Sequence, residues 1–248
     1  MKVADYIVNY LADRGVDRVF ILYGAASGHL IDAFTRVTKT KYVAVMHEQA
    51  AGFAVECWAK AKNIPGVAIV TSGPGAHNLV TSIANCFYDS VPAVFITGQI
   101  NTSFLRPDPS IRQVGFQESD IAGIVTPITK YAKMVTRKED IRFELEKAFF
   151  VAQDKRPGPV VLDIPVNVQE SLIEPDKLLA FDPATATDRF DLDEIDRRID
   201  SYLDDLATAK RPVLLVGGGV WFAGAVEAVR QVSETLKVPA FPTWNALD

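Results

Sequence analysis

The sequence has few cysteines, no excess of positive charge and no long apolar run. Cys57 and Cys86 are the only cysteines among 248 residues, too few for a disulfide framework and without the spacing of a metal site. The formal net charge is −5, so neither nucleic acid nor a membrane surface is expected as a partner. No apolar stretch approaches the roughly 20 residues that a membrane-spanning helix needs. These absences together predict a protein of a reduced, cytoplasmic compartment.

Short apolar runs alternate with helical patterns along the first two thirds of the chain. Hydrophobic residues make up 48% and charged residues 23% of the whole, which is typical of globular proteins. The apolar runs predict strands at 19–22, 42–46, 67–71, 92–97 and 160–164. The patterns between them predict helices at 3–14, 27–38, 48–61, 75–86 and 139–153.

The predicted strands are apolar at consecutive positions, as in strands that helices cover on both faces. The predicted fold class is therefore α/β, with a doubly wound parallel sheet. A polar stretch at 98–130 interrupts the pattern. It is too long for a simple crossover connection, so we expect a functional loop there.

The chain length favours more than one unit. We predict a first domain at 1–167, a linker at 168–190 and the start of a second α/β domain at 191–248. In the second domain the pattern predicts helices at 191–208 and 223–236, and strands at 212–216 and 239–242. Two strands are too few for a stable sheet, so we expect this domain to continue beyond Asp248.

Glu48 follows the second predicted strand and opens the helix at 48–61. Open α/β sheets bind their ligands outside the carboxyl ends of the strands, which is where this glutamate falls. A glutamate at a helix start also stabilises the helix dipole, by roughly 0.3–1 kcal/mol. Taken alone, Glu48 fits both a functional and a purely structural interpretation.

A glycine-rich turn, TSGPGAHN at 71–78, follows the third predicted strand. Its glycines would let backbone approach a ligand, and Pro74 favours a helix start. The turn could hold a phosphate at that helix start, or it could be an ordinary connection between strand and helix. Comparable turns at 23–27 and 97–99 follow two other strands, so four strand ends converge on one edge of the predicted sheet.

Five motifs occur in the order expected of one enzyme family. They are HEQAAGFAVECWAKA, TSGPGAHNLVTSIANCFYDSVPAVFITGQI, GFQESDI, PITKYA and RPGPVVLDIPVNVQ. They resemble the pyrimidine-binding domain of thiamine-diphosphate enzymes, and the resemblance is densest to the acetolactate-synthase type. It covers nearly all of residues 1–170, and residues 191–248 resemble the start of the central domain of that family.

The resemblance implies roles for individual residues. Glu48 matches the glutamate that hydrogen-bonds N1′ of the cofactor's aminopyrimidine and thereby promotes loss of the thiazolium C2 proton. The residues implied around the pyrimidine are Gly24, Ala25, Glu48, Thr71, Pro74 and Asn78. Those implied near the substrate or the thiazolium are Gln99, Phe116 and Gln117. Judged without the resemblance, Asn78 could equally bond local backbone, and Phe116 could equally belong to the core.

The resemblance also implies an activity. It points to a lyase or transferase that decarboxylates a 2-oxo acid and joins the fragment to a carbonyl acceptor, as in branched-chain amino-acid biosynthesis. The implied cofactors are thiamine diphosphate and Mg²⁺, with FAD as a further candidate, and the implied assembly is a homodimer or homotetramer. The GDG-type motif of the diphosphate and magnesium site is absent from the 248 residues, so we expect this chain alone to be inactive.

Some positions depart from the family pattern, and several alternatives stay open. The chain has LYGAAS at 22–27 where synthases commonly have YPGGAS, and His77 stands where they have threonine. SIRQVG at 110–115 is more similar to synthase-like proteins of sugar or polysaccharide pathways. His77 fits either a surface residue or a proton-transfer group. The Gly217–Gly219 triplet lacks the G-x-G-x-x-G spacing, which favours a plain turn over a dinucleotide site.

Three other functions remain as alternatives to a ligating synthase. The first is a non-ligating 2-oxo-acid decarboxylase or an oxalyl-CoA-type lyase. The second is a stand-alone subunit that supplies Glu48 to a partner carrying the diphosphate domain. The third is a non-catalytic homologue, which the retained glutamate disfavours.

Overall fold

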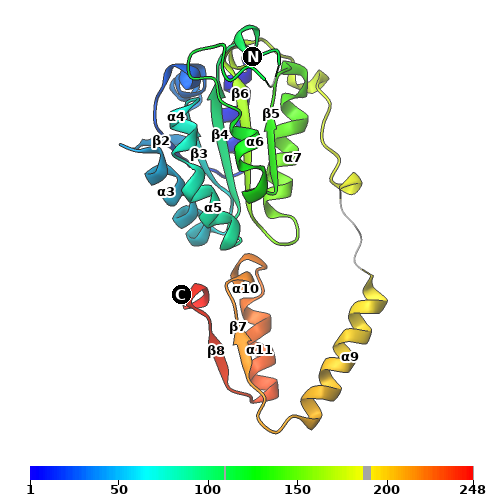
Figure 1. Ribbon diagram of the computed structural model, residues 1–248. Coiled ribbons are helices and arrows are strands. Elements are labelled where there is room, and N and C mark those ends of the chain that lie inside the picture. The colour runs from blue at the N-terminus through cyan, green and yellow to red at the C-terminus, as the bar shows by residue number, and fades with distance from the viewer. Residues whose placement is uncertain (109, 187–190, 248) are drawn as a thin grey trace. The chain divides into compact units, whose positions relative to one another are not determined.

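The computed structural model describes residues 1–108, 110–186 and 191–247. The chain divides into two compact units, Met1–Phe181 and Asp182–Asp248 (Figure 1). None of the helices in the described part of the chain is long and apolar enough to span a membrane.

The first unit is built on a six-stranded sheet with the order β2-β1-β3-β4-β6-β5 (Figure 1). Its strands are β1 (Arg18–Ile21), β2 (Lys41–Ala44), β3 (Gly66–Val70), β4 (Ala93–Gln99), β5 (Tyr131–Met134) and β6 (Pro159–Pro165). All five strand pairings are parallel. Every residue of β3, β4 and β6 is buried, as expected where helices cover both faces. The predicted α/β fold with a parallel sheet is confirmed.

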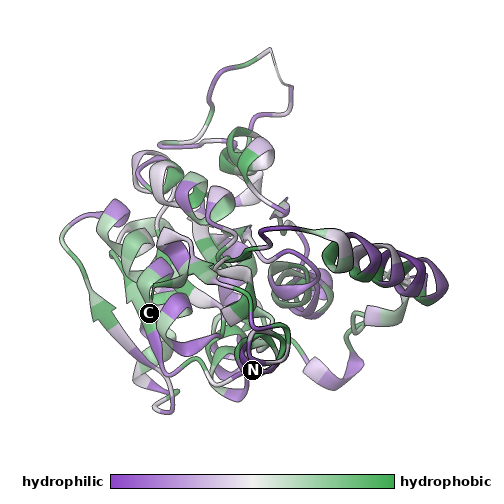
Figure 2. Ribbon diagram, turned by 90° about the horizontal axis from the view of Figure 1, so that it is seen from below, coloured by the Kyte–Doolittle hydropathy of each residue, from purple (hydrophilic) through white to green (hydrophobic). Residues whose placement is uncertain are grey.

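Helices flank this sheet on both sides. They are α1 (Val3–Asp13), α2 (Gly28–Asp32), α3 (Glu48–Lys62), α4 (Pro74–His77), α5 (Val80–Tyr88), α6 (Ile121–Val125), α7 (Ile141–Gln153) and α8 (Val166–Glu170). Residues of α1, α2, α7 and α8 share one buried cluster with Ile69 and Ile96 of the sheet. Successive side chains of a strand point to opposite faces, so Ala68 and Phe95 face the other layer, where α3 and α5 pack together. Figure 2 shows hydrophobic residues in green along the strands, while the helices carry both green and purple residues.

Several elements differ from the sequence prediction. The edge strand β5 was not predicted, because its residues are mostly half-buried and include Lys133, so it lacks a continuous apolar run. The predicted helix at 75–86 is two helices, α4 and α5, which meet at Asn78 and Leu79. The predicted helix at 27–38 is the short helix α2 between two 3₁₀ turns, Ala25–Ser27 and Ala33–Thr35.

The first unit continues to Phe181, past the boundary predicted at 167. Val168 and Ile173 are buried in it. Phe181 packs edge-on against Phe143 of α7, with ring centroids 5.5 Å apart. Residues 168–181 therefore add apolar packing to the first unit, although their polar sequence resembles a linker. The part of the predicted linker at 187–190 lies outside the described residues.

The described residues of the second unit form a two-stranded parallel sheet and three α-helices. Its elements are α9 (Leu192–Thr208), β7 (Leu214–Val216), α10 (Gly219–Phe222), α11 (Val226–Leu236) and β8 (Ala240–Pro242). The helix predicted at 223–236 corresponds to α11, which begins at Val226, shortly after Gly224 with its φ of +63°. The short helix α10 precedes that range and was not predicted. The Gly217–Gly219 triplet connects β7 to α10, as in an ordinary turn from strand to helix.

Candidate functional site

The site lies at the carboxyl edge of the parallel sheet. Ile21 of β1 pairs with Ile69 of β3, and Val70 pairs with Thr97 of β4. The segments that follow these strands are therefore neighbours at one edge. The four strand ends whose convergence we predicted meet there, and this edge is where open parallel sheets bind ligands.

Glu48 is the first residue of α3, and its side chain is nearly buried, with 7% exposed. The helix is capped by the preceding residue, because His47 Nδ1 accepts a hydrogen bond from the Gln49 N–H at 3.1 Å. Asn78 Nδ2 donates to Glu48 Oε2 at 2.8 Å. His47 therefore caps the helix. The Asn78 side-chain amide, at the end of α4, donates to the Glu48 carboxylate.

The second carboxylate oxygen of Glu48 faces a position without a side chain. A Cβ added at Gly75 would lie 3.0 Å from Glu48 Oε1 and 2.7 Å from Thr71 Cγ2. Gly75 belongs to the glycine-rich turn that enters α4. Any larger residue there would push on the carboxylate, so the turn leaves room beside Glu48 Oε1.

Thr71 joins the turns that follow β3 and β1. Its Oγ1 accepts a hydrogen bond from the Ala26 N–H at 3.2 Å, and a Cβ at Gly24 would lie 2.4 Å from Thr71 Cβ. Ala25, which lies between Gly24 and Ala26, begins the 3₁₀ turn in the loop after β1. The structure thus places Gly24 next to Thr71, and Thr71 and Glu48 both lie next to Gly75.

Gly73 connects the same turn to a more distant segment, and Pro74 follows it. Pro74 is the exposed first residue of α4. Gly73 has a φ of +56°, and a Cβ there would lie 2.8 Å from the carbonyl oxygen of Gln117. Gln117 itself has a left-handed backbone with φ of +61°, which is uncommon for a residue other than glycine. Gln117 therefore lies directly on the glycine-rich turn.

Phe116 is exposed and does not belong to the core. Its exposed fraction is 85%, although it stands between Gly115 and Gln117, which both pack closely on other segments. The core interpretation left open for Phe116 is therefore wrong. The structure places an aromatic side chain at the surface next to the turn that carries Pro74.

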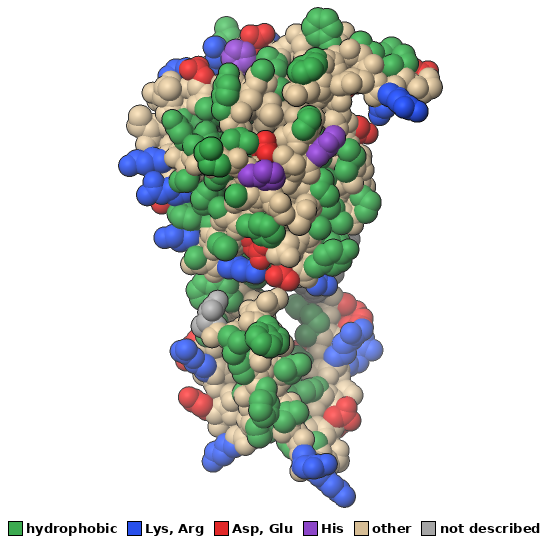
Figure 3. Space-filling view, turned by 60° about the vertical axis from the view of Figure 1, so that its left-hand side comes forward, with side chains coloured by type: hydrophobic (Ala, Val, Ile, Leu, Met, Phe, Trp, Pro, Cys, Tyr) green, Lys and Arg blue, Asp and Glu red, His purple; other side chains and the backbone are tan. Residues whose placement is uncertain are grey.

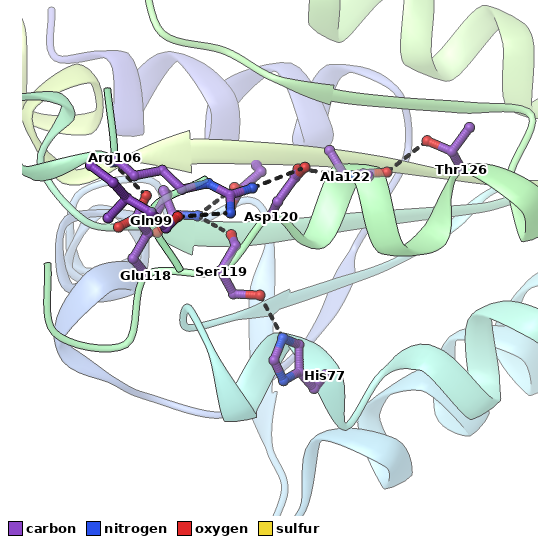
Figure 4. A network of polar contacts seen from close by, with 11 residues as sticks. His77, Gln99, Arg106, Glu118, Ser119, Asp120, Ala122 and Thr126 are labelled. Atoms are coloured by element: carbon purple, nitrogen blue, oxygen red, sulfur yellow. Dashed lines mark hydrogen bonds and ion pairs between the residues drawn. The ribbon is translucent and has the colours of Figure 1, made fainter. Parts of the chain in front are cut away.

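Gln99 lies beneath this region, with only 1% of its surface exposed. Its Nε2 donates to the Ser119 carbonyl at 2.7 Å and to Asp163 Oδ2 at 2.8 Å, while its Oε1 accepts from the Ile100 N–H at 2.9 Å. Both ends of the amide are therefore engaged by the chain itself. Gln99 links β4 and β6 to the loop that carries Phe116 and Gln117 (Figure 4).

Asp163 was missed by the sequence reasoning. It is fully buried in β6 and accepts hydrogen bonds from Thr97 Oγ1 at 2.7 Å and from Gln99. Burial raises the pKa of Asp163 to about 7, although the hydrogen bonds from Thr97 and Gln99 act to lower it. An aspartate inside the apolar run VVLDI was a visible signal of such a buried group.

Replacement of Asp163 by asparagine should change how stability depends on pH. The native pKa lies above the unfolded value of 3.8, so the native state keeps a proton that the unfolded chain releases. Between about pH 4 and 7 this group lowers the free energy of unfolding as pH rises, by up to about 1.4 kcal/mol per unit. Asp163→Asn removes that loss, so its stability relative to the parent should rise from pH 4.5 to 7.

Urea unfolding of the 248-residue chain at both pH values checks this expectation. Asp13→Asn, at an exposed position, controls for the loss of one carboxylate. A difference between Asp163→Asn and the parent that stays constant across this pH range would contradict the assignment of Asp163 as a buried group that titrates near neutrality.

His77 connects α4 to the loop after β4. Its Nε2 lies 2.5 Å from Ser119 Oγ, a hydrogen bond whose direction depends on the histidine tautomer (Figure 4). The side chain is exposed, as the surface interpretation required, but it is bonded to the same residue whose carbonyl Gln99 holds. In the described ranges of the chain, no group of three or more His, Cys, Asp or Glu residues could hold a metal ion.

Comparison with known proteins agrees with this geometry. Residues 1–124 match the family model described as thiamine pyrophosphate enzyme, N-terminal TPP binding domain. Residues 199–248 match the central domain of the same enzymes. The chain belongs to the thiamine pyrophosphate enzyme family. The resemblance that the five sequence motifs suggested is confirmed, and Glu48, Thr71, Pro74 and Asn78 all fall within the matched N-terminal domain.

Several proteins similar to this chain are acetolactate synthases. The chain is 40% identical to an acetolactate synthase large subunit of Corynebacterium glutamicum, over 100% of this chain and 38% of that protein. It is 36% identical to the isozyme 3 large subunit of Escherichia coli, over 95% of this chain and 40% of that protein. It is 38% identical to a chloroplastic acetolactate synthase of Arabidopsis thaliana, over 88% and 32%. The chain thus spans about two fifths or less of these relatives' lengths.

Proposed function

We propose that this chain is the aminopyrimidine-binding part of a thiamine-diphosphate enzyme of the acetolactate-synthase type, and that Glu48 is its activating carboxylate. One observation carries the proposal. A nearly buried glutamate at the carboxyl edge of the sheet has one oxygen held by Asn78 and the other beside the bare Gly75. The family match of residues 1–124 supports the choice of cofactor.

The donor set around Glu48 fits an aminopyrimidine ring. Glu48 would accept the hydrogen bond of a protonated ring nitrogen, and Asn78 would keep the carboxylate turned toward it. Thr71, through its hydrogen bond to the Ala26 N–H, would hold the Gly24–Ala25 turn at the side of the ring. Pro74, the first residue of α4, would border the bound ring at the start of that helix. Bound thiamine diphosphate would supply the carbanion chemistry that removes carbon dioxide from a 2-oxo acid.

Phe116 and Gln117 are proposed to contact the substrate. Phe116 offers an exposed aromatic face, and the left-handed backbone of Gln117 brings that segment onto Gly73. Both N–H donors of the Gln99 amide bond the chain, and its oxygen accepts from the Ile100 N–H. We therefore propose that Gln99 orients the segment rather than binding the substrate.

The proposed reaction is decarboxylation of a 2-oxo acid followed by transfer of the fragment to a carbonyl acceptor. The synthase relatives support the ligating outcome over a simple decarboxylase or an oxalyl-CoA-type lyase. Mg²⁺ with the diphosphate would be bound by a further domain, and FAD and a role in branched-chain amino-acid biosynthesis remain proposals of the same kind. We call this chain together with the polypeptide that supplies the diphosphate site the holoenzyme. That polypeptide can belong to the same subunit or to a separate one.

We also propose that the holoenzyme is a homo-oligomer. Large apolar side chains near the amino end of α3 are exposed, including Tyr42, Phe53 and the 96%-exposed Met46. The space-filling view shows hydrophobic side chains in green around histidine and acidic side chains on one face (Figure 3). Exposed apolar surface of this kind is typical of interfaces.

Product analysis tests the proposed reaction. The holoenzyme is incubated with thiamine diphosphate, Mg²⁺ and pyruvate, with and without a second carbonyl compound, and the products are identified by NMR. We expect carbon dioxide together with a hydroxy-ketone or hydroxy-keto acid that joins two substrate carbons. A product mixture that contains only the aldehyde would favour the non-ligating decarboxylase, and no release of carbon dioxide from any 2-oxo acid would contradict the proposal.

A further inference from the structure

Glu118 ties together both ends of the loop that leads to Phe116. Its Oε1 accepts a hydrogen bond from the Arg106 N–H at 2.7 Å, and its Oε2 accepts one from the Val114 N–H at 2.8 Å. One carboxylate therefore joins two backbone positions eight residues apart in the sequence (Figure 4). Hydrogen bonds from backbone N–H groups to a charged acceptor are short and strong.

The charge state of Glu118 suits this task. Burial acts to raise the pKa of its carboxyl, but the backbone N–H groups of Arg106, Val114 and Gly115 outweigh it, and the pKa is lowered overall. The side chain is thus an anion at neutral pH. Arg106 adds a further link within the loop, because its guanidinium donates to the Ile111 carbonyl at 3.3 Å.

The segment 114–119, which we call the Phe116 segment, is fixed on its other sides as well. A Cβ at Gly115 would lie 2.2 Å from Ile100 Cδ1, and Gln117 rests on Gly73. Ser119 is held through its carbonyl by Gln99 and through its hydroxyl by His77. Phe116 is 85% exposed, and it lies between residues 115 and 117, whose backbone packs against other segments.

We propose that Glu118 is a positioning residue. Its carboxylate fixes the Phe116 segment so that Phe116 and Gln117 contact the substrate beside Gly73 of the glycine-rich turn. This inference rests on the proposed function, because it takes the substrate to bind beside these two side chains. Glu118 acts on the substrate side of the site, whereas Asn78 holds the carboxylate of Glu48. The two halves of the site can therefore be perturbed separately.

Glu118→Ala and Glu118→Gln test the inference in the holoenzyme. A displacement of about 1 Å in a positioning group can cost about 100-fold, so kcat/KM for the 2-oxo acid should fall about 100-fold in Glu118→Ala. Glu118→Gln keeps one acceptor oxygen for two N–H donors, so an intermediate loss is expected. The matched control is Asp108→Ala, which removes another carboxylate of the same loop, one that accepts from the Ser110 N–H at 2.7 Å.

Two readouts separate positioning from general damage. Cofactor C2-proton exchange should stay within about twofold of the parent in both Glu118 variants, because Glu48 and Asn78 are untouched. Amide hydrogen exchange of the 248-residue chain should accelerate in peptides from the loop 106–119 and stay unchanged in α3. If Glu118→Ala does not fold, the same comparisons are made with Glu118→Gln.

Unchanged kcat/KM, unchanged amide exchange of the loop, or a parallel fall of C2-proton exchange and turnover would each overturn the role of Glu118. A failure of the proposed function looks different: the parent holoenzyme itself would then show no C2-proton exchange that depends on Glu48. The amide-exchange measurement decides whether Glu118 fixes the loop even in that case, because it does not require turnover.

Discussion

Replacing Glu48 with glutamine should slow cofactor C2-proton exchange in the holoenzyme by about 10²–10⁴-fold, the range for a positioned acid–base group. The carboxamide has nearly the same size and can still accept the hydrogen bond from Asn78 Nδ2. It cannot take up and release a proton at the ring nitrogen. The exchange rate, followed by NMR after acid quench, isolates this step from substrate binding and product release.

The chain contains a closely matched control for that variant. Glu56 lies on the same helix, is also 7% exposed and accepts a hydrogen bond from Asn85 Nδ2 at 2.6 Å. It pairs with Lys60 and lies two turns further along α3. Glu56→Gln should affect stability but leave C2-proton exchange within a fewfold of the parent. Equal exchange rates in the two variants would remove the special role of Glu48.

The second large effect is expected for Gly98→Ala in the central strand β4. The added Cβ would lie 1.9 Å from the Ala26 carbonyl oxygen and 2.8 Å from the Ser27 nitrogen. Both atoms belong to backbone, so no side chain can turn away to make room. We expect the free energy of unfolding to fall by about 3 kcal/mol, the upper part of the usual range for overpacked cores.

Gly28→Ala is the control for this variant, at a glycine two residues after Ala26 where an added Cβ has room. Apart from its chain neighbours and its own helix backbone, no described residue has an atom within 4 Å of a Cβ at Gly28, and its φ of −56° is helical. Alanine there should be neutral or should stabilise α2 by up to about 1 kcal/mol. Urea midpoints of the 248-residue chain compare the two variants. A Gly98→Ala chain as stable as Gly28→Ala would contradict the close packing of β4 against the Ala26 carbonyl.

The main architecture could be predicted from the sequence because the buried strands carry it directly. The runs within β3, β4 and β6 are apolar without alternation, and the parallel α/β fold follows from that pattern. The edge strand β5 could not be found in this way. Most of its residues are only half-buried, and Lys133 interrupts its apolar residues, so no continuous apolar run marks this strand.

The site could be predicted only as a set of segments. The strand ends placed Glu48 and Asn78 at the same edge, but a pattern cannot show that a side chain thirty positions away donates to the carboxylate. Gln99 shows the limit more sharply. The family resemblance implied a place near the substrate or the thiazolium, but it could not show that the Gln99 amide donates to the buried Asp163. Side-chain partners across a sheet depend on three-dimensional packing, which local spacing does not encode.

A structure of the holoenzyme with thiamine diphosphate bound tests the central claim most directly. The quantity to measure is the distance between the Glu48 carboxylate and N1′ of the aminopyrimidine. A hydrogen bond of about 2.6–3.2 Å, with Asn78 still bonded to the second oxygen of Glu48, is the predicted result. An aminopyrimidine ring bound elsewhere, or one whose N1′ contacts water or another side chain while Glu48 stays apart, would contradict the account.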